Sequence, residues 1–198
     1  MARRNDHTRE ELISLTLDSV KAFLNEHSYH ELSLRKVANM IGYVPSTLVN
    51  VFGNYNLLLL HVVAQTLDEL ATEAKAVVSQ CQDSEQALYQ LAYCYHDFAQ
   101  KNPYRWQLIF EHKMNGEELP DWQTERINNM TSMLEDLLAL LAPQKTSSEV
   151  LQASRVLWSG VHGITVLSVD DKFFANEPVD GKNLIKSLLS NYLSNWSR

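Results

Sequence analysis

Apolar residues recur along most of this chain at spacings of three and four, which is the period of an amphipathic α-helix. The first such segment opens at Thr8-x-x-Glu11, a capping-box pattern. Its apolar stripe consists of Ile13, Leu17, Val20 and Leu24. No alternating pattern of useful length predicts a β-strand, and no internal repeat interrupts the helical periodicity. We therefore expect an all-α protein of about nine helices.

Helix start and stop signals divide the rest of the chain. Asn102-Pro103 places proline at a first helical position, and Thr146-x-x-Glu149 is a second capping box. Gly53 ends one helix, and Asn54 and Asp180 can cap the helices that follow them. The later helices are expected at about 33–41, 45–51, 55–80, 84–100, from 103, from 120 to before Pro143, from 146 to about 170, and after Asp180.

Residues 33–52 have the pattern of a helix-turn-helix. Val37, Ala38 and Ile41 share one face of the first short helix, and Gly42 suits a left-handed turn residue. The buried face of the second helix is predicted to be Leu48, Val51 and Phe52. Its outward residues are then Ser46, Thr47, Val49 and Asn50. Two helices joined in this way present the second one to the major groove, so we expect a DNA-binding regulator.

Composition and charge change this interpretation little. The hydrophobic fraction of 45% supports a core, and the net charge is −7. Residues 1–60 hold six basic and six acidic side chains, so the acidic excess lies entirely in the remainder, with 11 basic and 18 acidic. A segment 1–60 without net charge is expected to bind DNA weakly, because affinity for DNA depends on cationic side chains near the phosphates. Dimerisation would double those contacts.

Two cysteines, Cys81 and Cys94, are too few for a disulfide framework in a chain of this size. The first residues lack the apolar segment of a secretory signal, and no run is long enough for a membrane span. We expect a cytoplasmic protein with no membrane partner.

Residues 8–60 resemble the DNA-binding domain of the TetR family of bacterial transcriptional regulators. The residues in register with its helix-turn-helix are Leu34, Arg35, Val37, Ala38, Gly42, Thr47, Leu48 and Phe52. The later half is similar to one ligand-binding subtype, through Trp158-x-x-x-His162-Gly163 and the segment 102–110. The resemblance implies a DNA-binding domain at 1–54, formed by three helices that include the helix-turn-helix, and an effector-binding and dimerisation domain at 55–198.

The resemblance also implies a set of DNA contacts, with three departures from the family pattern. Val44 and Val49 stand where the family has serine and tyrosine, and Tyr55 stands where it has lysine. The candidate DNA-binding residues are Arg3, Arg4, Arg35, Lys36, Val44, Pro45, Ser46, Thr47, Val49, Asn50 and Tyr55. Asn50 suits adenine, and Arg3 and Arg4 suit a minor-groove arm. Because phosphate contacts are altered, we expect either weaker and more salt-sensitive binding than is typical or compensation by Arg3, Arg4, Arg35 and Lys36.

Aromatic and methionine side chains are dense in the second half, where they form either ordinary core or the wall of a cavity. The candidate ligand-binding residues are Tyr93, Trp106, Phe110, Met130, Trp158 and His162. They suit an apolar or aromatic effector, and His162 is equally suited to packing. The family's two-helix dimer interface implies contacts by Leu157, Val161, Ile164, Leu184, Leu188 and Tyr192 in a homodimer.

Other classes of function have less support. The chain has no Gly-x-Gly-x-x-Gly or Walker loop, no Glu-x-x-His pair and no His-x-x-x-His pair. We therefore expect no enzyme, no catalytic residue, no metal and no cofactor, and inert thiols at Cys81 and Cys94 rather than a redox sensor. The predicted function is a repressor released from a palindromic operator by a small effector. The alternative is a helical binding module that has lost specific operator binding and acts through a protein or small-molecule partner.

Overall fold

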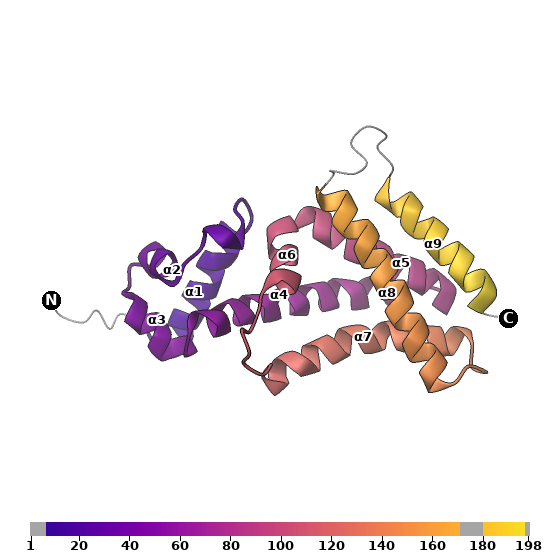
Figure 1. The fold of residues 1–198 in the computed structure, drawn as a ribbon, viewed down its shortest axis with the longest axis horizontal. Helices are drawn as coiled ribbons and strands as arrows, with labels where there is room; N and C mark the ends of the chain where they lie inside the picture. Colours follow the sequence, from indigo (N-terminus) through magenta and orange to yellow (C-terminus); the bar gives the residue numbers. More distant parts are fainter. Residues whose placement is uncertain (1–6, 171–179, 197–198) are drawn as a thin grey trace. The chain divides into compact units, whose positions relative to one another are not determined.

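A computed structural model describes residues 7–170 and 180–196. Within them it contains nine α-helices, one 3₁₀ turn and no β-strand (Figure 1). The elements in order are α1 (Arg9–Phe23), η1 (Tyr29–Glu31), α2 (Leu34–Met40), α3 (Pro45–Phe52), α4 (Tyr55–Val78), α5 (Ser84–Lys101), α6 (Pro103–Glu111), α7 (Asp121–Leu141), α8 (Ser147–Asp170) and α9 (Gly181–Trp196). The expected all-α fold is confirmed.

Side chains at the predicted positions cap the helices. Thr8 Oγ1 accepts from the Glu11 N–H at 3.2 Å, and the Glu11 carboxylate accepts from the Thr8 N–H at 2.7 Å. Thr146 and Glu149 repeat this reciprocal pair at the start of α8, at 3.3 and 2.8 Å. Asn54 Oδ1 caps α4 by accepting from the Leu57 N–H. These bonds satisfy N–H groups that have no acceptor within the helix.

The chain forms two compact units, and α4 contributes to both. Unit 1 comprises residues 1–66 and 104–119, and unit 2 comprises residues 67–103 and 120–198. Unit 1 therefore contains α1 to α3, the first half of α4 and nearly all of α6. The sequence-based division after residue 54 is a functional one, between a DNA-binding domain at 1–54 and an effector-binding and dimerisation domain at 55–198. It stays a prediction.

The buried face of α1 in unit 1 differs by one position from the expected stripe. Leu12, Thr16, Leu17 and Val20 are buried, whereas Ile13 is only half-buried. Thr16 occupies a core position because its hydroxyl donates to the Leu12 carbonyl at 2.6 Å. A buried polar group that is satisfied in this way costs little, but it interrupts the apolar pattern in the sequence.

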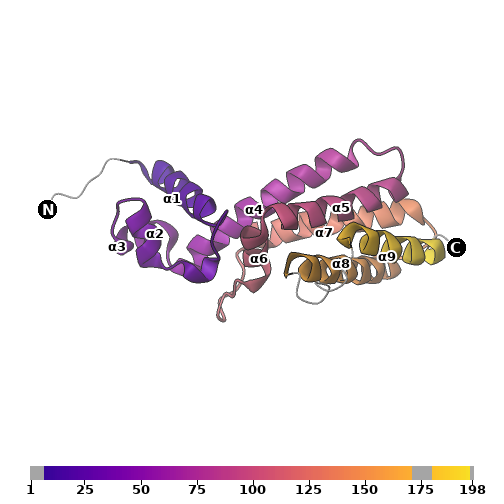
Figure 2. The ribbon, with the colours of Figure 1, turned by 90° about the horizontal axis from the view of Figure 1, so that it is seen from above.

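Unit 2 is a bundle in which α5, α7, α8 and α9 pack on one another (Figure 2). Helices α8 and α9 lie side by side in both views. The Leu188 side chain of α9 packs against Gly160 of α8, where a Cβ atom would lie 2.6 Å from Leu188 Cδ2. Leu157, Ile185 and Leu189 are almost completely buried within this bundle.

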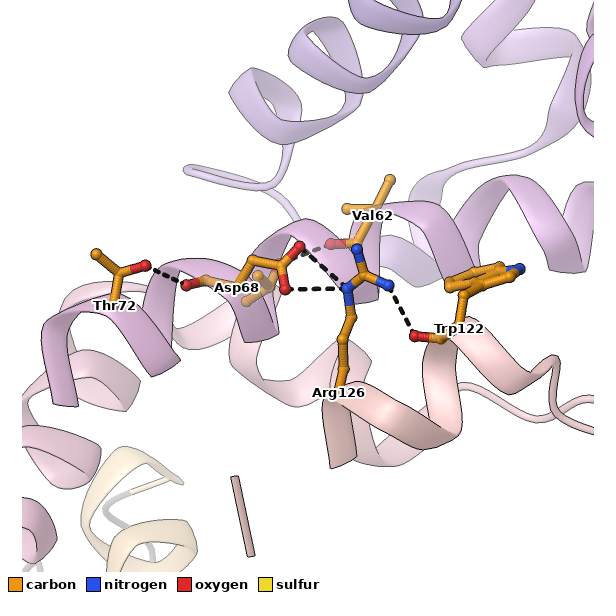
Figure 3. Close-up of polar contacts among 6 residues, drawn as sticks. Val62, Asp68, Thr72, Trp122 and Arg126 are labelled. Carbon is orange, nitrogen blue, oxygen red and sulfur yellow. Dashed lines mark hydrogen bonds and ion pairs between the residues drawn. The ribbon is translucent and has the colours of Figure 1, made fainter. Parts of the chain in front are cut away.

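A polar contact joins α7 to the part of α4 that belongs to unit 2. Arg126 Nε donates to both carboxylate oxygens of Asp68, at 2.9 and 3.0 Å (Figure 3). Arg126 Nη1 also donates to the Trp122 carbonyl at 2.7 Å, so the guanidinium is fixed by two partners. Both partners of the ion pair are partly exposed, which limits its contribution to about 1 kcal/mol or less.

No single helix in the described residues is long and apolar enough to cross a membrane. Helices α3 and α4 meet the length and composition criteria only when taken together, and the chain bends by 64° between them.

Candidate nucleic-acid interface and apolar cavity

The turn between α2 and α3 has the bond pattern of a Schellman motif. Gly42 has φ = 75°, the left-handed conformation expected for it. The Tyr43 N–H donates to the Ala38 carbonyl at 2.9 Å, and the Gly42 N–H donates to the Asn39 carbonyl at 3.2 Å. The turn therefore ends α2 sharply and fixes the direction in which α3 begins.

Helix α3 is anchored by one face and open on the other. Leu48 and Phe52 are buried, as are Val37 and Ala38 of α2, so the helix pair shares a core. The exposed residues of α3 are Ser46, Val49 and Asn50, and Pro45 and Thr47 are half-buried. An exposed face built from small polar, amide and short apolar side chains carries the groups that read base edges. Whether these residues contact DNA remains a prediction.

The candidate DNA-binding residues that lie outside α3 differ in their exposure and contacts. Val44 is 60% exposed at the N-cap of α3 and makes no side-chain capping bond within the described residues. Arg35 is exposed on α2, whereas the Lys36 ammonium lies 4.2 Å from the centre of the Phe23 ring. Arg3 and Arg4 lie outside the described residues.

Tyr55 departs from the role that its position in the motif implies. Its hydroxyl is buried and has no hydrogen-bond partner in the part of the chain that the structure describes. Burial, with a smaller effect of Tyr29, raises the pKa of Tyr55 to about 12. In this arrangement the hydroxyl is turned away from solvent, so it is not presented to a phosphate.

Unit 2 contains a small apolar cavity of about 40 Å³. Its wall is formed by Leu70, Ala74, Leu88, Leu91, Ala92, Tyr95, Met130, Leu134, Leu157, Trp158, Val161 and Leu189. Two of the six candidate ligand residues, Met130 and Trp158, belong to this wall. Trp106 and Phe110 do not, since both belong to unit 1, where their rings lie 5.2 Å apart.

The polar border of the cavity is a contact between α5 and α8. Tyr95 Oη lies 2.7 Å from His162 Nδ1, and the Tyr95 ring lies 5.0 Å from the Trp158 ring. Burial lowers the pKa of His162, so its imidazole is neutral at pH 7. His162 thus holds a wall residue in place. Tyr95, which the sequence pattern did not single out, is the polar residue of the wall.

The sequence of residues 88–192 matches the family model described as "Tetracyclin repressor-like, C-terminal domain". The match covers more than half of the 198 residues. This chain belongs to the TetR family. No curated protein matches its sequence.

Solved structures show the fold of this TetR-family chain at low sequence identity. A protein of unknown function from Rhodococcus sp. RHA1 is 15% identical with a TM-score of 0.79, over 100% of each chain. The TetR family transcriptional regulator PfmR from Thermus thermophilus is 14% identical with a TM-score of 0.63, over 90% of this chain and 97% of its own. AibR, in complex with isovaleryl coenzyme A and operator DNA, is 9% identical with a TM-score of 0.63, over 93% of this chain and 97% of its own.

The candidate dimer residues of this TetR-family chain fall into two groups. Leu157 and Val161 are buried and line the cavity, which leaves their side chains little surface for a second copy. The partly exposed members are Ile164, Leu184, Leu188 and Tyr192. The remaining ligand candidate, Tyr93, is half-buried on α5 beside Lys182, whose ammonium lies 5.9 Å from its ring centre.

Two contacts near the N-terminus were missed by sequence reasoning. Arg9 Nη2 donates to the Val51 carbonyl of α3 at 3.1 Å, and His7 Nδ1 lies 2.7 Å from Tyr43 Oη. Both tie the start of α1 to the α2–α3 segment. Val51 lies 42 residues after Arg9, and Tyr43 lies 36 residues after His7, so no local spacing in the sequence indicates these contacts.

Proposed function

We propose that this chain is a DNA-binding transcriptional regulator, a repressor that leaves a palindromic operator when a small apolar or aromatic effector binds. The observation that carries the proposal is the orientation of α3, whose Leu48 and Phe52 are buried while Ser46, Val49 and Asn50 are exposed. A short helix anchored by one face and open on the other is the geometry of a recognition helix.

Individual side chains on and around α3 have specific tasks in this proposal. Asn50 pairs with adenine through its amide, and Val49 or Pro45 contacts a thymine methyl. Thr47 donates to a phosphate, and Arg35 supplies positive charge. Lys36 and the terminal Arg3 and Arg4 add cations to the same duplex. The proposal does not include Tyr55, because its hydroxyl is buried.

The effector half of the proposal is supported by the apolar cavity beside Met130 and Trp158. A space of about 40 Å³ admits only a few atoms, so a larger effector has to displace wall side chains. The wall selects for an apolar or aromatic group, and the Trp158-x-x-x-His162-Gly163 subtype resemblance belongs to this part of the proposal. AibR, a structural neighbour, was crystallised with both isovaleryl coenzyme A and operator DNA, and that pairing supports an effector-controlled regulator.

The proposed homodimer joins two chains through α8 and α9. Ile164, Leu184, Leu188 and Tyr192 keep exposed surface on these helices and supply apolar contacts. A two-fold pair presents two copies of α3, and a palindrome supplies two matching half-sites separated by about one helical turn of 34–36 Å or a multiple of it.

Selection of random-sequence duplexes by the purified full chain tests this function. The proposal expects enrichment of one palindrome, and Asn50→Ala should lose its preference at one position of each half-site. Asn39→Ala, an exposed asparagine on α2, is the matched control and should select the same palindrome.

The alternative function is a helical binding module without a specific operator. It is favoured by two observations, the missing side-chain cap at Val44 and the buried hydroxyl of Tyr55. Each of these features removes a phosphate contact that would fix the position of the DNA-binding domain on the duplex. If selection enriches no duplex sequence over the input, the regulator is contradicted and the binding module is favoured.

A further inference from the structure

Helix α3 depends on other segments for its position. It has only eight residues, and its N-cap residue Val44 makes no side-chain capping bond within the described residues. Isolated helices of this length are not stable in water, so contacts from outside the helix have to hold it in place. Leu48 and Phe52 are buried and anchor one face, but they do not by themselves fix the two ends.

The residues at the start of α1 contact both ends of α3. His7 Nδ1 lies 2.7 Å from the hydroxyl of Tyr43, the residue directly before the N-cap of α3. At the other end, Arg9 Nη2 donates to the carbonyl of Val51 at 3.1 Å, one residue before the end of α3. The segment 7–9 therefore joins α1 to both ends of α3, and all of these residues belong to unit 1.

The segment 7–9 is itself fixed, so it can serve as an anchor. Thr8 is the N-cap of α1 and exchanges two hydrogen bonds with Glu11, at 3.2 and 2.7 Å. This capping box orders the backbone between His7 and Arg9. Because that backbone is already ordered, the bonds from His7 and Arg9 to the neighbouring segment do not have to offset the entropy of ordering it.

The charge of Arg9 suits the end of α3 better than it suits α1. Arg9 is the first residue of α1, where the positive end of the helix dipole disfavours a cation. Its guanidinium bonds at the C-terminal end of α3, where the dipole favours a cation and the last carbonyl groups have no partner within the helix. The Gly53 N–H donates to the Val49 carbonyl, and Arg9 donates to the Val51 carbonyl. Arg9 is thus a charged cap of α3 that another helix supplies.

The exposed face of α3 lies between these two anchored ends. Ser46, Val49 and Asn50 are exposed there, while Leu48 and Phe52 set which face is buried. Hydrogen bonds to base edges weaken steeply when their angles depart from linearity, so they are sensitive to a small tilt of the helix. Contacts at both ends limit such a tilt.

We propose that Tyr43 and Arg9 are positioning residues for the reading of DNA sequence by α3. The first holds the N-terminal end of the helix through His7, and the second holds the C-terminal end through the Val51 carbonyl. This inference rests on the function proposed above, because it concerns how α3 reads. It differs from a phosphate contact, since a cation near phosphates strengthens binding to every duplex, whereas positioning strengthens binding to the matching sequence.

Tyr43→Phe tests the N-terminal anchor in the full chain without changing its charge. Without the bond to His7, DNA binding has to order this end of α3. Affinity for the selected palindrome, measured by fluorescence anisotropy, should therefore fall by about two- to tenfold, the range for losing one hydrogen bond. Affinity for a scrambled duplex should not change. Tyr29→Phe is the matched control, because Tyr29 is a half-buried phenol of unit 1 whose hydroxyl bonds instead to the Glu111 carbonyl. It should bind both duplexes as the unmodified chain does.

Arg9→Met tests the C-terminal anchor and separates positioning from charge. It keeps most of the length of the side chain but removes the donor to Val51. Positioning predicts a similar loss on the palindrome, with no loss on the scrambled duplex and an unchanged dependence of affinity on salt. A phosphate contact would weaken both duplexes and reduce the slope of log affinity against log salt by about one for each Arg9 lost, which would overturn the role assigned to Arg9.

Hydrogen exchange of the free chain distinguishes a failure of this inference from a failure of the proposed function. Amides of α3 should exchange faster in Tyr43→Phe and Arg9→Met than in Tyr29→Phe, while amides of α1 keep their protection. Circular dichroism establishes that each variant retains the fold. If α3 exchanges as in Tyr29→Phe, or if Tyr43→Phe weakens both duplexes equally, positioning is overturned even when the unmodified chain selects a palindrome. If the unmodified chain selects none, the proposed function fails, and the reading role of Tyr43 and Arg9 fails with it, whatever the exchange shows.

Discussion

Tyr95 on α5 and His162 on α8 meet through a 2.7 Å contact between the phenolic oxygen and Nδ1, at the edge of the apolar cavity. Tyr95→Phe removes the hydroxyl and leaves Nδ1 without this partner, so the free energy of unfolding should fall by about 1 kcal/mol. Urea denaturation followed by circular dichroism measures the change. Tyr93→Phe, a half-buried neighbour on the same helix, should change it by less than about 0.5 kcal/mol. Equal effects of the two substitutions would refute a specific role for the Tyr95–His162 contact.

Leu157 tests the packing around the cavity. It is 1% exposed and belongs to the cavity wall, so Leu157→Ala should lower the free energy of unfolding by about 2–5 kcal/mol. Benzene should restore part of the lost thermal stability by entering the enlarged apolar space. Leu151→Ala on the same helix is the control, because Leu151 is 45% exposed, and it should cost less than about 1 kcal/mol. A Leu157→Ala variant as stable as the control would mean that the wall is not packed as described.

Three histidines, His96, which is buried, and His112 and His162, which are half-buried, predict how stability depends on pH. Burial lowers the pKa of His96, His112 and His162 from the usual value of 6.5. Between the folded and unfolded pKa values the unfolded chain binds more protons, so the free energy of unfolding falls as the pH drops below 6.5. Urea midpoints at pH 7.5 and 5.5 measure the fall, and His162→Gln should make it smaller. A midpoint that rises toward pH 5.5 would contradict the assignment.

Gly42 tests whether the turn sets the direction of α3. Gly42 and Gly116 both have positive φ, 75° and 94°, and neither has a described atom within 4 Å of an added Cβ. Each glycine-to-alanine change should therefore cost a similar amount of stability, about 1–2 kcal/mol, through backbone strain alone. Only Gly42→Ala should weaken binding to the selected palindrome, as measured by fluorescence anisotropy. If Gly116→Ala weakens binding equally, the loss reflects general stability rather than the orientation of α3.

Local chemistry made much of the fold predictable. The capping boxes at Thr8 and Thr146 and the left-handed Gly42 follow from neighbouring residues alone, and the structure confirms all three. The buried face of α1 was predicted one position off, because it includes the polar residue Thr16. The Thr16 hydroxyl can be buried since it donates to the Leu12 carbonyl of its own helix.

The sites were less predictable because they depend on distant residues. The burial of the Tyr55 hydroxyl depends on packing in unit 1, where Tyr55 lines a hollow together with residues 111–113 and 115, more than 50 positions away. Trp106 and Phe110 are aromatic side chains of the kind that line an apolar cavity, yet they pack on each other in unit 1 and do not reach the cavity of unit 2. Helical periodicity indicates that a side chain points inward, but it does not indicate which interior it enters.

The central claim, that α3 reads DNA sequence, is tested most directly by the affinity of Asn50→Ala for the selected palindrome and for a scrambled duplex at the same salt concentration. The claim predicts a loss of about 1–3 kcal/mol on the palindrome, with little change on the scrambled duplex. Asn39→Ala should bind both duplexes as the unmodified chain does. If the unmodified chain binds the two duplexes equally, or if Asn50→Ala weakens both by the same factor, then α3 does not read sequence and the claim is contradicted.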